Sequence, residues 1–373
     1  MHRFEGDLSG LWRLQERKPI HHLTWDWWWW LVMLEDEGGN PAGKQLMVLW
    51  STKDNPLVEV NGVKWQPVGR PSIDEDGGGI AIEGMVAAWW YDGKEMPEPL
   101  VLESCRIIIV GEKSQLWPGE SGGAVIAINE RELSMGLKPD LSAFWLRLET
   151  EHGLFDLAMS PWNPAMSTAR RASAEYAKGM GYDILRLHGS ICKGTIAGKE
   201  VKGSAYFQKV CIQAPSIPWF WGVLHLDDGS YIDWFVPHIS PLISAKDSKP
   251  NKHRDLGHYP LSQGGIFHDV QNQRSENFAK VTVERIVGKE GLPTFSIHLW
   301  NGKSDIRIEA EAVSRAHWTF DQPTRGGIWS HLTYNEYPLI VKKLAIKDDK
   351  GLRKRKDWGT IHGNAEHAWG LLH

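Results

Sequence analysis

The chain has few of the residues that mark disulfide-rich, metal-binding or membrane-spanning proteins. Its 373 residues include only three cysteines, which are too scattered for a disulfide framework or a zinc site. No Cys-x-x-Cys, His-Glu-x-x-His or aspartate-rich calcium loop occurs, so we expect no metal. No apolar run approaches the ~20 residues of a membrane helix, and the first residues do not resemble a secretory leader. The sequence therefore predicts a soluble, cytoplasmic protein.

The chain also lacks an excess of charge of either sign. It has 42 Lys and Arg against 46 Asp and Glu, a net charge of −4. This balance gives no reason to expect binding to nucleic acid or to an anionic membrane surface. It leaves transient membrane contact and the oligomeric state open.

Tryptophan, by contrast, is abundant. The chain has 21 Trp, more than its 10 Phe or 8 Tyr, and four of them are consecutive at 27–30. On a strand, successive side chains point to opposite faces, so this run would make two adjacent walls aromatic. The pattern suggests a large apolar cavity. Trp28 and Trp30 share a face with Asp26, and we expect that face to meet the ligand.

Most of the sequence has the alternating pattern and Gly, Asp, Asn and Pro turns of an all-β protein. Such a protein avoids exposed edges by forming closed or nearly closed barrels. The alanine-rich segment 163–179, with Pro164 at its start, predicts one helix that connects strands or plugs a barrel end. Segment 246–263 is typical of a linker.

Segment 219–238 predicts a β-hairpin with a two-residue type I′ turn at Asp228-Gly229. Opposite residues share a face, and in this register one face would consist of Trp219, Trp221, Val223, His225, Ile232, Trp234, Val236 and His238. His225 and His238 would then lie among tryptophans, a setting for proton transfer. The alternative is that both histidines are structural.

Two other motifs have simpler interpretations as turns. The segment 38–44 has the spacing of a phosphate-binding loop, but Gln45 replaces the metal-binding Ser or Thr and strands flank it on both sides. The segment 119–123 fits the Gly-x-Ser-x-Gly elbow of a serine hydrolase, with Ser121 as nucleophile. The strand and helix that the elbow requires do not flank it, so a hydrolase is a minor alternative.

Three motifs together resemble the carotenoid 1,2-hydratase (hydroxyneurosporene synthase) and AttH-like family. Asp26-Trp27-Trp28-Trp29 is similar to the family's Glu-Trp-Trp-Tyr strand. Gly203-Ser-Ala-Tyr206-Phe-Gln208, followed by Pro218-Trp219-Phe-Trp221, fits its central Gly-x-x-Tyr-x-Glu/Gln strand and Pro-x-x-Trp-x-Trp hairpin. Glu366-His367-Ala368-Trp369-Gly370 resembles a terminal Asp/Glu-His-Asn-Trp-Gly strand, with Ala in place of Asn.

The resemblance implies two consecutive lipocalin-like β-barrel domains, which we place at residues 1–245 and 246–373. It also implies hydration, cyclisation or isomerisation of a hydrophobic isoprenoid-like or polyketide-like substrate without a cofactor. Such chemistry begins when a neutral carboxylic acid protonates an alkene, and burial raises a carboxyl pKa as this requires.

Asp26 and Glu366 are the candidate acids, because each lies in a tryptophan-bearing strand. His225 or His367 could then accept a proton or direct water. The expected substrate-binding residues are Trp28, Trp30, Tyr206, Gln208, Trp219, Trp221, Trp234, His238 and Trp369. Two alternatives remain open: the carboxyls satisfy buried donors only, or the protein is a non-catalytic carrier of a lipid or pigment.

Overall fold

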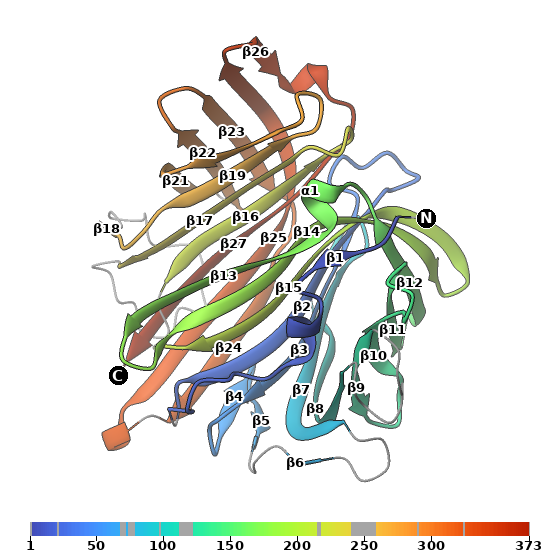
Figure 1. Cartoon of the computed structure of the whole chain (residues 1–373), viewed down its shortest axis with the longest axis vertical. Helices are drawn as coiled ribbons and strands as arrows, with labels where there is room; N and C mark the ends of the chain where they lie inside the picture. The colour runs from blue at the N-terminus through green and yellow to red at the C-terminus, as the bar shows by residue number, and fades with distance from the viewer. Residues whose placement is uncertain are drawn as a thin grey trace.

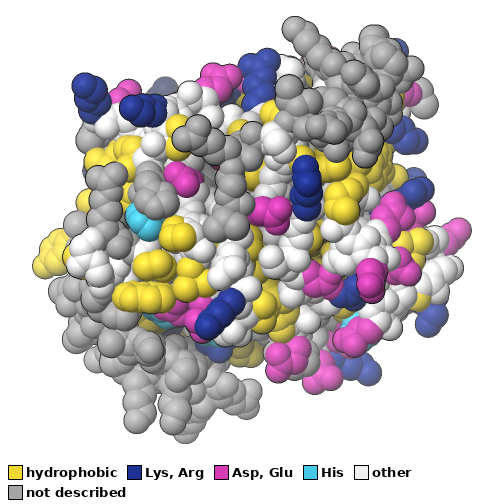
Figure 2. Space-filling view, turned by 90° about the horizontal axis from the view of Figure 1, so that it is seen from below, with side chains coloured by type: hydrophobic (Ala, Val, Ile, Leu, Met, Phe, Trp, Pro, Cys, Tyr) yellow, Lys and Arg dark blue, Asp and Glu magenta, His cyan; other side chains and the backbone are white. Residues whose placement is uncertain are grey.

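The computed structural model confirms an all-β protein, with strands arranged in two sheets of 13 and 14 strands. The structure describes residues 2–20, 22–67, 72–73, 79–96, 98–111, 122–214, 218–239, 259–288, 291–323 and 325–372. Among them, no helix has the length and apolar character needed to cross a membrane. Figure 2 shows acidic and basic side chains interspersed over the described part of one face.

Ten strands of the first sheet close into an antiparallel barrel, because β14 pairs with both β12 and β15. In ladder order these strands are β14 (Met180–Ile196), β12 (Gly153–Pro161), β11 (Phe144–Thr150), β10 (Leu133–Leu137), β9 (Gly123–Ile128), β8 (Pro99–Val110), β7 (Ile80–Tyr91), β3 (Lys44–Lys53), β2 (Thr24–Leu34) and β15 (Lys199–Gln213). The sheet also contains β1 (Glu5–Gly6), β6 (Ser72–Ile73) and β13 (Thr168–Ala177).

The second sheet curves around a core of its own. Its main path is β20 (Arg274–Phe278), β19 (Gly264–Asp269), β17 (Tyr231–Ile239), β16 (Trp219–Leu226), β27 (Ile361–Leu372), β25 (Trp329–Asp348), β23 (Asp305–Ala312), β22 (Pro293–Trp300) and β21 (Lys280–Val287). Shorter or branching strands are β4 (Val58–Val60), β5 (Val63–Trp65), β18 (Tyr259–Pro260), β24 (Ala316–Pro323) and β26 (Gly351–Lys354). Short 3₁₀ turns lie at Ser9–Trp12, Arg325–Gly327 and Arg355–Asp357.

A third apolar cluster joins the two sheets. It contains side chains from β2, β3 and β7 of the barrel together with side chains from β16, β24 and β25 of the second sheet. In Figure 1 the yellow-to-red strands of the second sheet lie beside the long strands β14 and β15. Apart from the short strands β4 and β5, the second sheet is built from β16 and the strands that follow it in the chain.

The predicted helix at 163–179 is wrong for most of its length. Helix α1 covers only Pro164–Ser167, where the Asn163 side chain accepts a hydrogen bond from the Met166 amide at 3.2 Å. The following residues form β13, which pairs with β14. Helix propensity is a weak preference, and the ladder offered by a neighbouring strand overrides it here.

The loop at 38–43 joins β2 to β3, which pair as an antiparallel hairpin, so its interpretation as a turn is confirmed. Ser121, the minor hydrolase candidate, lies outside the described residues.

The hairpin of β16 and β17 forms as predicted, but its register differs by one residue. The Leu226 amide donates to the Ser230 carbonyl, which leaves a three-residue loop whose last residue, Gly229, has φ +83°. Such loops place glycine in the left-handed region at their end. A slip of one residue moves a whole strand to the other face. Tyr231, Asp233, Phe235 and Pro237, not the even-numbered residues, therefore share a face with Trp219 and Trp221.

This register places Trp234 against Gly222, and we expect Gly222→Ala to be destabilising. A Cβ at Gly222 would meet Cζ2 of Trp234 at 2.1 Å. Overpacking of this kind costs about 1–3 kcal/mol, measurable as a lower urea midpoint. The matched control is Gly264→Ala in β19, where no atom lies within 4 Å of the new Cβ. Equal effects of the two substitutions would contradict the register.

Candidate active site

An aromatic cavity of about 400 Å³ lies between the two sheets. Barrel strands β2, β3, β14 and β15 form one wall, and β16, β17, β24, β25 and β27 form the other. The lining side chains are Ile20, His22, Leu23, Trp25, Trp27, Trp29, Leu49, Lys53, Tyr182, Ile184, Arg186, Gln208, Val210, Ile212, Ala214, Trp219, Trp221, Phe235, Pro237, Trp318, Phe320, Gln322, Ser330, Leu332, Tyr334, Glu336 and Glu366.

The barrel wall consists of three cross-strand rows, because every second residue of each strand points into the cavity. The rows are Lys53, Trp25, Ile212 and Tyr182; then Trp27, Val210 and Ile184; then Leu49, Trp29, Gln208 and Arg186. At each end a tryptophan of this wall contacts the opposite wall. Trp25 packs against Phe320 with centroids 5.2 Å apart, and Trp29 packs edge-on against Trp221 at 5.5 Å.

The face of β2 that we expected to meet the ligand is the wrong one. Trp25, Trp27 and Trp29 line the cavity, whereas Trp28 and Trp30 lie in the core of the barrel. Alternation along the strand fixes which residues share a face, but the closure of the barrel decides which face is inside.

Asp26 lies on this inner face of β2 and does not line the cavity. Its Oδ1 lies 2.6 Å from Nζ of Lys209, and both side chains are buried. The Lys209 ammonium also lies 4.2 Å from the centre of the Trp28 ring. Burial lowers the pKa of Lys209, but the charges and hydrogen bonds of Asp26 and Cys211 together outweigh burial, so the net shift is upward. Asp26 therefore belongs to a buried ion pair outside the cavity.

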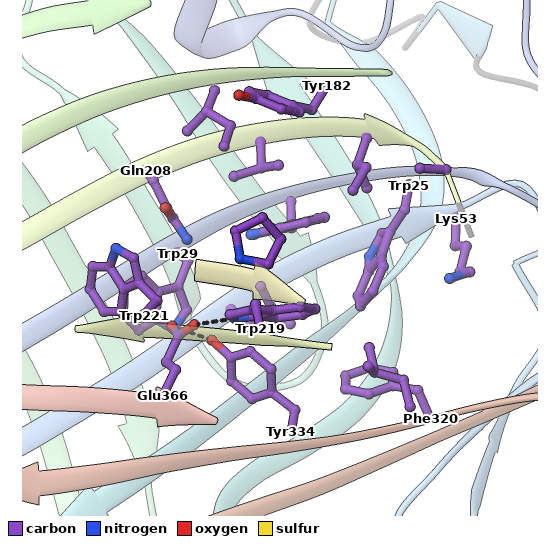
Figure 3. A pocket seen from close by; sticks show the side chains of 18 of the residues that line it. Trp25, Trp29, Lys53, Tyr182, Gln208, Trp219, Trp221, Phe320, Tyr334 and Glu366 are labelled. Atoms are coloured by element: carbon purple, nitrogen blue, oxygen red, sulfur yellow. Dashed lines mark hydrogen bonds between the residues drawn. The ribbon is translucent and has the colours of Figure 1, made fainter. Parts of the chain in front are cut away.

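Glu366 does point into the cavity, from β27. The Trp219 indole N–H donates to its Oε2 at 2.9 Å, and the Tyr334 hydroxyl donates to its Oε1. Figure 3 shows the carboxyl group held between these two rings. The residue is only 4% exposed.

A second carboxyl group, that of Glu336 in β25, lies directly opposite Glu366. Residues opposite each other on adjacent antiparallel strands share a face, and both line the cavity. Glu336 is fully buried, and the Tyr334 hydroxyl and the Trp29 indole N–H lie near its carboxyl group, where both act to lower its pKa. Trp29 belongs to the facing wall.

The two carboxyl groups are held toward their neutral forms. Burial raises the pKa of Glu366 to about 7, against the opposing effects of the Tyr334 and Trp219 hydrogen bonds and of the Arg186 charge. Burial, followed by the charge of Glu366, raises the pKa of Glu336 well above its ordinary value. Two carboxyl groups in close contact cannot both ionise easily. The pair therefore retains protons to higher pH than isolated carboxyl groups do.

The other predicted site residues divide between the cavity and the cores. Gln208, Trp219 and Trp221 line the cavity. Tyr206 is on the same face of β15 as Gln208, packs against Trp29 and Trp221 just beyond the cavity, and donates its hydroxyl to Gln208 at 3.2 Å. Trp234 belongs to the core of the second sheet.

The predicted histidines do not line the cavity. His225 is buried against Ser204 Oγ at 2.8 Å and the His188 carbonyl at 2.7 Å, and burial lowers its pKa to about 3. Both His238 and His367 stack on Phe220. His367, next to Glu366 in β27, points to the opposite face, where it accepts a hydrogen bond from Arg285. The one-residue slip explains the placement of His238, and strand alternation explains that of His367. His225 keeps the face of Trp219 and Trp221 but lies four residues beyond Trp221 along β16.

Trp369, the last predicted substrate-binding residue, packs against His331 with centroids 5.7 Å apart and is absent from the cavity wall.

The sequence analysis missed several polar residues of the cavity, among them Lys53, Arg186, Tyr334 and Glu336. Glu336 had a weak local signal, since it directly precedes the apolar run at 337–341 of β25. Its position opposite Glu366 depends on a register between distant segments. Within the described residues, no group of three or more His, Cys, Asp or Glu side chains could hold a metal ion.

The fold and the cavity define the class: an all-β protein in which a closed barrel and a second sheet enclose an aromatic chamber with paired carboxyl groups. No protein-family model and no curated protein matches the sequence.

Similar folds occur among solved structures. CghA in complex with Sch210972 has a TM-score of 0.50 at 9% identity, covering 99% of this chain and 98% of CghA. A candidate AttH protein of Nitrosomonas europaea has a TM-score of 0.47 at 11% identity, covering 95% and 97%. Kievitone hydratase of Nectria haematococca has a TM-score of 0.42 at 10% identity, covering 99% and 98%. The resemblance drawn from the sequence is thus confirmed as a likeness of fold.

Proposed function

We propose that this protein is a cofactor-independent acid/base enzyme that protonates an alkene in a hydrophobic isoprenoid-like or polyketide-like substrate. The observation that carries the proposal is the buried carboxyl group of Glu366, which faces an aromatic cavity and lies opposite Glu336. A carrier needs no neutral acid inside its cavity, whereas an enzyme of this kind requires one. CghA, which shares the fold, has been crystallised with Sch210972, and this supports a small-molecule ligand.

In the proposed reaction Glu366 donates its proton to one alkene carbon, and the π electrons form the new C–H bond. Its pKa of about 7 suits this role, because a general acid works best when its pKa lies near the working pH. The neighbouring carbon becomes a carbocation and Glu366 a carboxylate. The Trp219 and Tyr334 donors, already in place, stabilise that carboxylate.

The carbocation would lie among indole rings. A cation over a desolvated indole face is stabilised by roughly 0.5–2 kcal/mol, and Trp29, Trp219 and Trp221 surround the carboxyl pair. The cation can capture water, lose a different proton, or join a second alkene to form a new cation, which then ends in one of the first two ways. The proton released in that final step returns to the Glu366 carboxylate, so the enzyme ends unchanged.

Deuterium incorporation tests the proposal even when the product is unidentified. Ligand that copurifies with the protein is extracted, identified by mass spectrometry and returned to the protein in ²H₂O. Protonation at carbon places a non-exchangeable deuterium in the substrate or product, whichever of the three outcomes follows. Ligand recovered without carbon-bound deuterium would reject the enzyme in favour of the carrier.

We expect the rate of deuterium incorporation to fall as pH rises. The acid must be protonated, and burial raises the pKa of Glu366 to about 7. The rate should therefore be highest below pH 7 and decline about tenfold per pH unit well above it. A pH profile of initial rates checks this. A rate that increases through the same range would indicate that the ionised carboxylate is the active form.

A further inference from the structure

The end of the cavity away from the carboxyl pair contains a buried lysine. Lys53 is the last residue of β3 and lies opposite Trp25 in the first row of the barrel wall. It is 8% exposed, and its Nζ lies 4.1 Å from the centre of the Trp25 ring. Figure 3 shows Lys53 beside Trp25 and Phe320, across the cavity from Glu366.

This ammonium group has no counter-ion among the described residues. Its partner there is the Trp25 ring, and no carboxylate pairs with it. The carboxylates of the cavity wall, Glu336 and Glu366, lie at the other end. An isolated buried ammonium is unfavourable unless it is paired, and burial lowers the pKa of Lys53 to about 7. The remaining charged or titratable groups of the wall are His22, Tyr182, Arg186 and Tyr334.

The separation of the two ends follows from strand geometry. The rows of Trp25 and Trp29 are four residues apart on β2, which is roughly 13 Å at the usual rise per residue. Lys53 belongs to the first of these rows, and Trp29 contacts Trp221, the neighbour of Glu366 on β16. The space between them is lined by apolar rings and aliphatic side chains.

We propose that Lys53 binds an acidic group of the ligand, so that the cavity accepts an elongated apolar acid with its carboxylate at Lys53 and its far alkene at Glu366. The binding of the acid at Lys53 stands on the geometry of that end, while the position of the reacting alkene rests on the proposed function. The arriving carboxylate supplies the missing counter-ion, and the buried pair is stronger than one in water. The Trp25 ring already stabilises the charged form of the lysine.

The test compares farnesoic acid with methyl farnesoate, which share a polyprenyl chain and differ in charge. We expect the wild-type protein to bind the acid at least tenfold more tightly than the ester at neutral pH, measured by calorimetry. Lys53→Met keeps a long side chain but removes its charge. It should abolish this preference by weakening the binding of the acid while leaving the binding of the ester unchanged. The matched control is Lys280→Met, since Lys280 also lies over an indole ring, Trp300, at 4.4 Å, but on the surface.

Equal binding of acid and ester by the wild-type protein, or a preference that survives in Lys53→Met, would overturn the proposal. So would the absence of binding of both. A lysine that instead reacts covalently would be trapped as an adduct by farnesal and cyanoborohydride. Formation of this adduct by a protein that shows no preference for the acid would also overturn the proposal. Acid preference that depends on Lys53, found without any deuterium incorporation, would support the anion site and reject the proposed function.

Discussion

Replacing Glu366 by Gln is expected to lower the rate of deuterium incorporation by about a thousandfold, within the 10²–10⁴ range of general acid catalysis. The amide has nearly the shape of the carboxyl group but carries no acidic proton. Its oxygen can still accept the hydrogen bond that Trp219 or Tyr334 donates. Binding of the ligand should therefore change little while proton transfer is lost.

Glu336→Gln is the matched control for this variant. Burial and the charge of Glu366 raise the pKa of Glu336 well above the ordinary value, which favours its neutral form. The neutral amide therefore resembles the form already present, and we expect a much smaller loss of rate. If Glu336→Gln is the more damaging substitution, the proton comes from Glu336. If neither has an effect, neither carboxyl group is the acid.

Replacing Lys209 by Met is expected to destabilise the protein by about 3–5 kcal/mol, the usual cost of leaving a buried charge without its partner. Lys209 and Asp26 are 1% and 6% exposed in their side chains, with 2.6 Å between Nζ and Oδ1. Met preserves the length of the side chain, so the loss would reflect the unpaired carboxylate. Urea unfolding, followed by tryptophan fluorescence, measures the change.

Two further variants test whether the unpaired carboxylate causes this loss of stability. Adding Asp26→Asn to Lys209→Met removes the orphaned charge, and most of the stability should return. Lys202→Met breaks the exposed pair with Glu35, whose side chains are 69% and 50% exposed, and should cost less than about 1 kcal/mol. A small effect of Lys209→Met, similar to that of Lys202→Met, would contradict the importance of the pair.

The fold was largely predictable because its signals are local. Apolar residues around a turn sequence predicted the hairpin at 219–238, and β16 and β17 form it. The abundance of tryptophan correctly suggested an aromatic cavity. The helix failed because the partner strand of β13, β14, offered a ladder that local composition does not reveal.

The site was predictable only in part, because it depends on pairing between distant segments. Glu366 was identified from its sequence motif, and it lies in the cavity. Glu336 and Lys53 reach the same cavity through registers that no local pattern specifies. The β16–β17 hairpin shows how sensitive the site is to register, since one extra loop residue moved Trp234 to the other face of the hairpin.

The rows of side chains along the cavity have a consequence for substrate length. Because β2, β14 and β15 contribute every second residue, the wall repeats at intervals of roughly 6.6 Å. A ligand held at one end would place its remote carbons at fixed levels, and the bulk of the middle row, Trp27, Val210 and Ile184, would decide how far they reach. Selectivity among substrates that differ only in chain length would then change in steps set by the spacing of residues along the strands. Several adjacent substrate carbons would be accepted or rejected together.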